Sequence, residues 1–136
     1  EVISMFSGKI RSKNIENIIQ GPWEEGNDGT VLRYLEDGQI ITAAGKPGNE
    51  YSMGLLDPGD IILSLDYPGN SSARNTLRGT VTRMNLEDEG RSILVTVNIQ
   101  DTVLTSRITK GSLSRLGIVP GSTVILVFKS NSIRWA

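Results

Sequence analysis

The chain has 136 residues, enough for one ordinary domain or two very small ones. It contains no cysteine and no histidine, which excludes a disulfide framework, a thiolate metal site and the commonest general base. Residues 1–69 carry a net charge of −6 and residues 70–136 carry +5, so an anion would be attracted to the second half. The alternative explanation for this charge difference is that the two halves dock through surfaces of complementary charge.

The composition favours an all-β chain. An apolar share of 38%, 15 glycines and few aromatic residues fit many short strands joined by turns. No apolar run approaches the ~18 residues of a membrane span, and no signal peptide is visible, so we expect no membrane insertion. The chain begins at Glu1 rather than at a methionine, as a fragment of a longer protein would.

The first half is predicted to form short strands between turn signals. We expect these strands at Met5–Ile10, Thr30–Glu36, Gln39–Ala44 and Asp60–Leu65. Asp37-Gly38 predicts a hairpin turn. Residues 11–20 are ambiguous, because three isoleucines have helical spacing and two asparagines disfavour a helix. Trp23 is either a ligand platform or a cap on a small core, which is the commoner role.

The second half follows a similar plan with one helix added. Strands are expected at Leu77–Met84, Ile93–Gln100, Thr102–Ile108 and Thr123–Lys129, with an acidic turn over residues 85–90. Thr109 is placed to N-cap a short helix that runs through Leu116. Gly117 is placed to end that helix.

The two halves contain an internal repeat. Leu56–Leu65 parallels Ile118–Val127 around a shared Pro-Gly, Phe6–Ile10 parallels Leu77–Val81, and Ile41-Thr42 parallels Leu104-Thr105. Two copies of a unit with about five strands predict two small OB-like barrels in tandem. We place the first barrel at residues 1–69 and the second at residues 70–136.

The segment Ser71-Ser72-Ala73-Arg74-Asn75 concentrates hydrogen-bond donors before a predicted strand. Two hydroxyls, a guanidinium and an amide provide several donors and one permanent positive charge, which suits a small oxyanion. The alternative is a polar turn between two domains, since serine and asparagine favour turns.

Further motifs follow this segment in the chain: Ile108-Thr109, Leu116-Gly117 with Pro120-Gly121, and Lys129-Ser130. In this order and spacing, the motifs together resemble the pattern of the molybdate-binding Mop/TOBE domain family. The resemblance covers Asn70 to Trp135 and implies paired OB-like barrels. The first copy has Glu1-Val2-Ile3-Ser4 opposite the Ser-Ala-Arg-Asn segment and Tyr67-Pro68 opposite Lys129-Ser130. The first copy is therefore expected to be degenerate, a pattern most similar to the C-terminal regulatory region of a molybdate/tungstate ABC transporter ATP-binding subunit.

The resemblance implies a site for molybdate or tungstate, with the metal bound only as its oxyanion, no organic cofactor and no catalytic residue. A tetrahedral dianion only accepts hydrogen bonds at neutral pH, so its site should supply donors. The implied ligands are Ser72, Ala73, Arg74, Thr109, Lys129 and Ser130, and weaker candidates are Asn75, Lys110 and Ser112. The N-terminus of the helix would add donors. Two alternatives stay open, a plain N-cap role for Thr109 and an ion pair between Arg74 and the first half.

The resemblance also implies partners. In the family the pocket is completed across a subunit interface, which implies a homodimer or higher homo-oligomer. The chain would be cytoplasmic, fused to an ABC ATPase domain and membrane-associated only through the transporter. A nucleic-acid role is disfavoured because the second copy offers only Phe128 and Trp135 for stacking, and no motif indicates an enzyme. A TOBE-like structural or dimerisation module without oxyanion binding, and a stand-alone molbindin-type storage protein, are the alternative functions.

Overall fold

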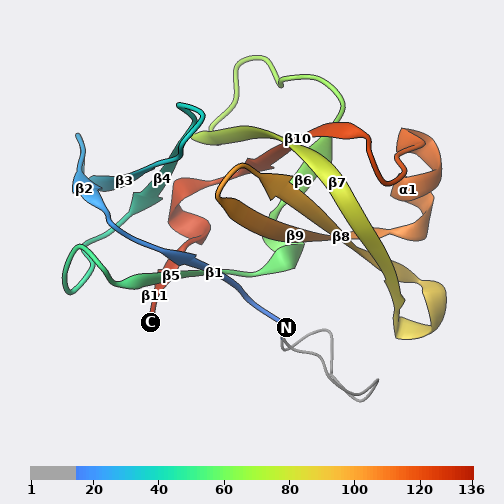
Figure 1. Ribbon diagram of the computed structural model, residues 1–136, viewed down its shortest axis with the longest axis horizontal. Coiled ribbons are helices and arrows are strands. Elements are labelled where there is room, and N and C mark those ends of the chain that lie inside the picture. The colour runs from blue at the N-terminus through green and yellow to red at the C-terminus, as the bar shows by residue number, and fades with distance from the viewer. Residues whose placement is uncertain (1–14) are drawn as a thin grey trace.

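The structure is a computed structural model that describes residues 15–136. The predicted strand Met5–Ile10 and the Glu1–Ser4 segment lie outside the described residues. The proposed repeat of Phe6–Ile10 at Leu77–Val81 therefore stays a prediction. The described chain consists of strands in three antiparallel sheets with one short α-helix (Figure 1). The all-β prediction is confirmed.

Two small sheets are built mainly from the first half. One has the order β1-β5-β11, and the other has the order β2-β3-β4. Their strands are β1 (Asn17–Gln20), β5 (Met53–Leu56), β11 (Arg134–Trp135), β2 (Glu24–Glu25), β3 (Thr30–Tyr34) and β4 (Ile40–Ala44).

The largest sheet has five strands in the order β6-β10-β7-β8-β9. Its strands are β6 (Ile62–Ser64), β7 (Asn75–Glu87), β8 (Ser92–Ile99), β9 (Thr102–Thr109) and β10 (Thr123–Phe128). The helix α1 (Lys110–Leu116) follows β9, and short 3₁₀ turns form η2 (Pro58–Asp60), η3 (Asp88–Gly90) and η4 (Ser130–Ser132).

The two halves exchange strands. β6 of the first half pairs with β10 of the second, and the C-terminal β11 returns to pair with β5. Ile133 is buried against the first half, and Trp135 meets Trp23 edge to face with ring centroids 5.0 Å apart. Trp23 therefore belongs to the core. The proposed boundary at 69/70 falls in the loop between β6 and β7 and stays a prediction.

Two buried asparagines tie each half to the other. Asn75 Oδ1 accepts from the Thr42 amide (2.7 Å), and its Nδ2 donates to the Thr42 carbonyl (2.9 Å). Asn17 Oδ1 and Nδ2 make the same two bonds to the backbone of Thr105, both at 2.8 Å. Thr42 and Thr105 are equivalent in the sequence repeat. We call these contacts the asparagine clamps, since each joins the first strand of one half to a strand edge of the other.

The clamps reveal a second frame for the repeat, Asn17-Ile18-Ile19-Gln20-Gly21 with Asn75-Thr76-Leu77-Arg78-Gly79. Both glycines are required by close approach: a Cβ on Gly21 would lie 2.0 Å from the Glu50 carbonyl oxygen, and one on Gly79 would lie 2.6 Å from Val97 Cγ1. In this frame Glu16 stands where the second copy has Arg74. The Glu16 carboxylate lies 2.6 Å from Arg134.

Some predicted elements differ from those observed. In residues 11–20 the described part contains strand β1, in which Asn17 and Ile19 are buried while their neighbours are exposed. The two-residue alternation, rather than the helical spacing of the isoleucines, therefore sets its structure. Residues 85–87 continue β7 in register with β8 and only residues 88–90 turn, so the predicted acidic turn at 85–90 was too long. Strands β2, β5 and β11 were not predicted, because they have only two to four residues and β11 pairs with the distant β5.

The hairpin around Asp37-Gly38 and the helix are confirmed. The hairpin joins β3 to β4, with Tyr34 opposite Ile40. The helix begins after Thr109, whose Oγ1 accepts from the Ser112 amide at 3.1 Å. It ends at Gly117, whose φ of 65° is the left-handed conformation that glycine adopts easily.

Replacement of Asn75 by alanine is expected to lower the free energy of unfolding by about 2–4 kcal/mol, because the buried Thr42 amide and carbonyl would both lose their partner. Urea denaturation measures the change. Asn98→Ala, at an exposed position of β8, is the matched control. Equal losses in the two variants would show that the clamp does not hold the halves together.

Candidate functional site

Strand register brings two of the predicted motifs together. Asn75 at the start of β7 is opposite Phe128 at the end of β10. Arg74 directly precedes β7 and Lys129 directly follows β10, so the two residues come next to this pair, with Ser72, Ala73 and Ser130 within two positions of them along the chain. We call these five residues the cationic half-site.

The positive charges of the cationic half-site are not neutralised by neighbours. Arg74 and Lys129 are exposed, and neither makes an ion pair within residues 15–136. An ion pair between Arg74 and the first half is thus not observed in the described chain. Two cations without an ion-pair partner at neighbouring positions of the fold would attract an anion.

Other members of the Ser-Ala-Arg-Asn segment already have partners. The Ala73 amide donates to Ser71 Oγ at 3.0 Å, so Ser71 holds the turn. Both polar atoms of the Asn75 side chain are bonded to Thr42, and the residue is fully buried. Asn75 therefore positions the segment and exposes no group to a ligand.

Thr109, Lys110 and Ser112 lie elsewhere in the same chain. Thr109 is opposite Ser92, and Ser92 is opposite Glu87 at the far end of β7 from Asn75. The thirteen residues of β7 extend on the order of 40 Å. Figure 1 shows α1 and the start of β7 at opposite ends of the five-stranded sheet. The predicted ligands thus form two groups, and we call Thr109 and Ser112 the helical half-site.

Hydrogen-bond geometry distinguishes the two hydroxyls of the helical half-site. Thr109 Oγ1 accepts from the Ser112 amide and donates its proton to Ser112 Oγ at 3.1 Å. Ser112 Oγ also accepts from Arg115 at 3.3 Å, so its own proton is available to a ligand. Thr109 acts as the N-cap, and Ser112 is the better donor. Because α1 has seven residues and its cap is satisfied, we assign no anion-binding role to the helix terminus.

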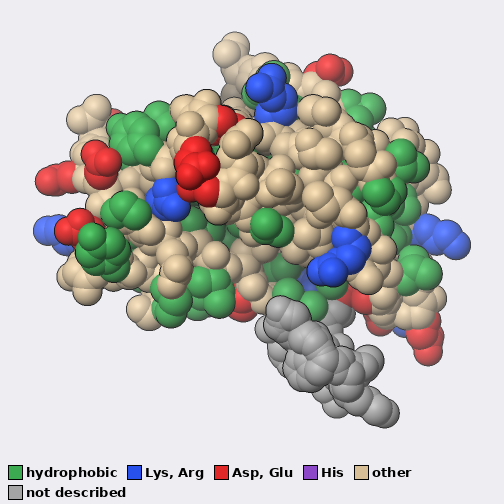
Figure 2. Space-filling view, in the orientation of Figure 1, with side chains coloured by type: hydrophobic (Ala, Val, Ile, Leu, Met, Phe, Trp, Pro, Cys, Tyr) green, Lys and Arg blue, Asp and Glu red, His purple; other side chains and the backbone are tan. Residues whose placement is uncertain are grey.

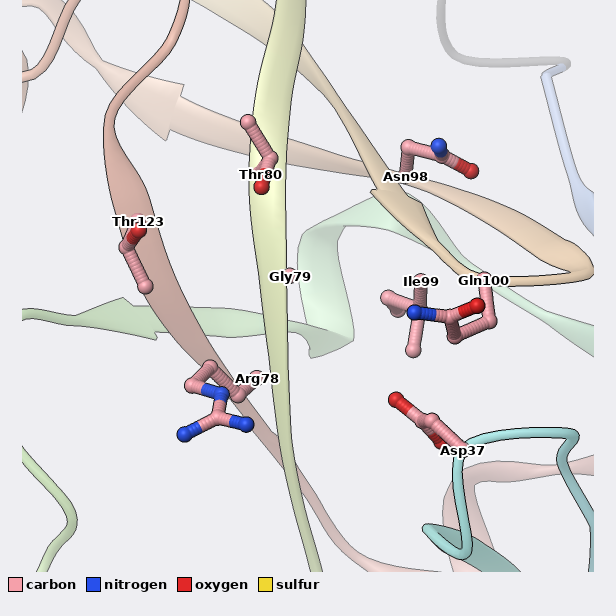
Figure 3. A pocket seen from close by; sticks show the side chains of 8 residues that line it. All are labelled: Asp37, Arg78, Gly79, Thr80, Asn98, Ile99, Gln100 and Thr123. Carbon is pink, nitrogen blue, oxygen red and sulfur yellow. The ribbon is translucent and has the colours of Figure 1, made fainter.

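A separate polar hollow of about 150 Å³ lies across β7, β8 and β10. Figure 3 shows Arg78 and Asp37 on opposite sides of Gly79 at this hollow. Gln39 holds the hairpin against β7 by accepting from the Arg78 amide and donating to both the Arg78 carbonyl and Asp37. A carboxylate at the mouth repels an oxyanion, so this hollow does not fit the predicted ligand.

Within residues 15–136, no group of three or more acidic side chains could hold a metal ion. The same part of the chain has no helix long and apolar enough to cross a membrane.

The TOBE domain family matches residues 71–134, which include the cationic half-site, the helical half-site and α1. Residues 71–134 are therefore a TOBE domain. The match begins within the loop before β7 and ends at β11, so it follows the second half of the fold.

Relatives and a solved structure extend the similarity to the first half. The molybdate/tungstate import ATP-binding protein WtpC of Pyrococcus abyssi is 34% identical over 93% of this chain and 34% of its own length. The molybdenum import ATP-binding protein ModC 2 of Azotobacter vinelandii is 34% identical over 62% of this chain and 27% of its own length. The chain thus spans about a third or less of these relatives. The molybdate-bound structure of the cytoplasmic molybdate-binding protein ModG is 25% identical with a TM-score of 0.67, and the match covers 94% of this chain and 98% of that protein.

Thr109→Ala is expected to lower the free energy of unfolding by about 1 kcal/mol, because the Ser112 amide would lose its cap. Thr109→Ser keeps the oxygen and should retain most of the stability. Chemical denaturation of both variants measures the difference. If alanine and serine gave the same stability, Thr109 would not be the cap.

The pKa of the Asp37 carboxyl is lowered below 3.8, first by the hydrogen bonds from the Gln39 side chain and backbone, and last by the charge of Arg78. Gln39→Ala should therefore raise the pKa of Asp37 more than Arg78→Ala does, as measured by NMR titration of the carboxyl. Because the pKa of Asp37 is lowered, its hydrogen bonds with Gln39 stabilise the fold above about pH 3.8. This contribution is lost as the pH falls through the pKa that Asp37 has in the folded state. A larger effect of Arg78→Ala would contradict this assignment.

Proposed function

We propose that this chain binds molybdate or tungstate in the cytoplasm as the oxyanion-sensing part of an ABC transporter ATP-binding subunit. The observation that supports the proposal is the pairing of Asn75 with Phe128, because Arg74 directly precedes the first of these residues and Lys129 directly follows the second, and each cation has a serine within two positions. Ser72 and Ser130 are those serines.

The chemistry of the cationic half-site suits a tetrahedral dianion. Arg74 and Lys129 would neutralise the two negative charges, and Ser72 and Ser130 would donate to its oxygens. No carboxylate belongs to this group of residues, so the group contains no charge that repels a dianion. Molybdate and tungstate have nearly the same size and charge, so the site should bind both.

The separation of the two half-sites supports a site that two subunits share. Because Ser112 and Lys129 lie at different ends of the sheet, one chain would supply the cationic half-site and a second would supply the helical half-site. We therefore propose a homodimer or higher homo-oligomer with the oxyanion at the interface. The proton on Ser112 Oγ that is free to donate would complete the set of donors.

The asparagine clamp offers a route from the ligand to the rest of the chain. Ligand binding would fix the segment Ser72–Arg74, and the next residue, Asn75, is bonded to Thr42 in β4. A change in that segment would thus be transmitted directly to the first half. In a transporter subunit this would shift the relative position of the attached domains according to oxyanion supply.

A second candidate function is a stand-alone storage protein. The match to ModG covers 98% of that protein, so a unit of this size exists as an independent molybdate-binding protein. In the relatives that are ATP-binding proteins, the matched part is instead only 17 to 34% of the whole length. Both functions require the same oxyanion site, and they differ in whether binding leads to storage of the oxyanion or to control of a transporter.

Isothermal titration calorimetry tests the proposal. We expect molybdate and tungstate to bind and sulfate to bind weakly in a phosphate-free buffer. Lys129→Ala should weaken binding roughly 10- to 100-fold, because a charge-assisted hydrogen bond contributes about 1.5–3 kcal/mol. Ser112→Ala should weaken binding less, since it removes one neutral donor.

Lys46→Ala, at an exposed lysine in the first half, is the matched control and should bind like the wild type. Absence of heat with any of the three oxyanions, from a folded protein, would contradict the proposed function. The TOBE-like structural module would then be the better account.

A further inference from the structure

The polar hollow across β7, β8 and β10 lies where the two halves of the chain meet. Its lining includes a row of three exposed polar side chains, because strand register places Thr123 opposite Thr80 and Thr80 opposite Asn98. Asp37, in the hairpin between β3 and β4, contributes to the lining from the first half. Ligand sites occur preferentially at such junctions between domains.

The segments that form the hollow are already tied together. The Gln39 side chain accepts from the Arg78 amide at 2.6 Å and donates to the Arg78 carbonyl at 2.9 Å, which holds the β3–β4 hairpin on β7. At the β8–β9 turn, Asp101 follows the lining residue Gln100 and pairs with Arg33 of β3 at 3.4 Å. A ligand would therefore bind a hollow that is preformed, with little cost of ordering its walls.

Two opposite charges distinguish the hollow from the surface around it. Side chains that are neither charged nor hydrophobic cover much of the five-stranded sheet in the view of Figure 2. Arg78 and Asp37 are the charged residues of the described lining, on opposite sides of Gly79 (Figure 3). Within residues 15–136 neither makes an ion pair. The two carboxylate oxygens of Asp37 accept from Gln39, which leaves about half of their roughly four acceptor positions for a ligand.

These two charges decide the class of ligand that the hollow can hold. An anion would be repelled by Asp37, and a cation would be repelled by Arg78. A neutral ligand would displace water from both charges without pairing with either of them. A zwitterion satisfies both, because its carboxylate can accept a bidentate pair of hydrogen bonds from the guanidinium while its ammonium donates to the carboxylate.

The volume of the hollow limits the size of that zwitterion. A volume of about 150 Å³ corresponds to roughly five water molecules of about 30 Å³ each, which suits the smallest amino acids. We propose that the hollow binds a small free α-amino acid, such as glycine, alanine or serine, with its carboxylate on Arg78 and its ammonium on Asp37. The hydroxyls of Thr80 and Thr123 and the amide of Asn98 would face its remaining polar atoms.

An amino acid in this position would join the two halves of the chain. Asp37 belongs to the first half, and Arg78 follows Asn75 of the asparagine clamp by three positions in the second half. The ligand would thus add a contact beside the clamp and would stabilise the folded chain, since the unfolded chain has no such hollow. No lining residue belongs to the cationic or the helical half-site, so this inference does not depend on the proposed function.

NMR titration of the 136-residue chain with glycine tests the site. We expect saturable changes in the chemical shifts of the backbone amides of Gly79, Thr80 and Gln100. Acetate lacks the ammonium and methylamine lacks the carboxylate, so each should bind about tenfold more weakly than glycine, or weaker still, for want of one charge-assisted contact. Arg78→Gln and Asp37→Asn should each weaken glycine binding by about the same factor for the same reason.

Glu36→Gln and Arg83→Gln change exposed residues outside the lining, so these matched controls should bind glycine like the wild type. Thermal unfolding gives a second measurement, in which saturating glycine should raise the midpoint of the wild type and the controls more than that of Arg78→Gln or Asp37→Asn. Absence of saturable changes with glycine, acetate binding as tight as that of glycine, or glycine binding unchanged in both hollow variants would each overturn the inference. The oxyanion site would stand in all three cases, because it shares no residue with the hollow.

Discussion

Two buried asparagines hold this fold together, because each supplies the backbone hydrogen bonds that a strand edge of the opposite half lacks. Asn17 satisfies Thr105 in β9, and Asn75 satisfies Thr42 in β4. An unpaired buried peptide group costs free energy comparable to a lost hydrogen bond, so neither edge could be covered without its asparagine. The exchange of β6 and β11 between the halves adds apolar burial to the same interface.

The clamps also connect structure to the proposed function. Asn75 belongs to the fold through Thr42 and to the cationic half-site through its neighbour Arg74. In the first half, Asn17 has the same structural role, whereas its neighbour Glu16 is a carboxylate paired with Arg134. The fold thus repeats, but the charge that would attract an oxyanion occurs in one copy only. The structure, which is similar to ModG, therefore uses different residues for two roles. The asparagines hold the halves together in both copies, and the cations that would bind a ligand occur in the second copy.

Local signals in the sequence predicted the local parts of the structure. Thr109 and Gly117 mark both ends of α1, and Asp37-Gly38 marks the hairpin, because each depends on a few neighbouring residues. Strands β5 and β11 were missed, since their pairing joins residues 79 and 81 positions apart. The clamps were missed although the Asn-x-x-x-Gly repeat was visible, because their partners are set by topology. For the same reason the sequence could not show that Ser112 and Lys129 lie apart.

The most direct test of the central claim is a crystal structure grown with tungstate, in which anomalous scattering at the tungsten absorption edge locates the metal. The account predicts a tungsten peak between Lys129 and Ser130 of one copy and Ser112 of a second copy. A peak bounded by residues of a single copy, or a peak at neither half-site, would contradict the claim that two clamped chains share one oxyanion.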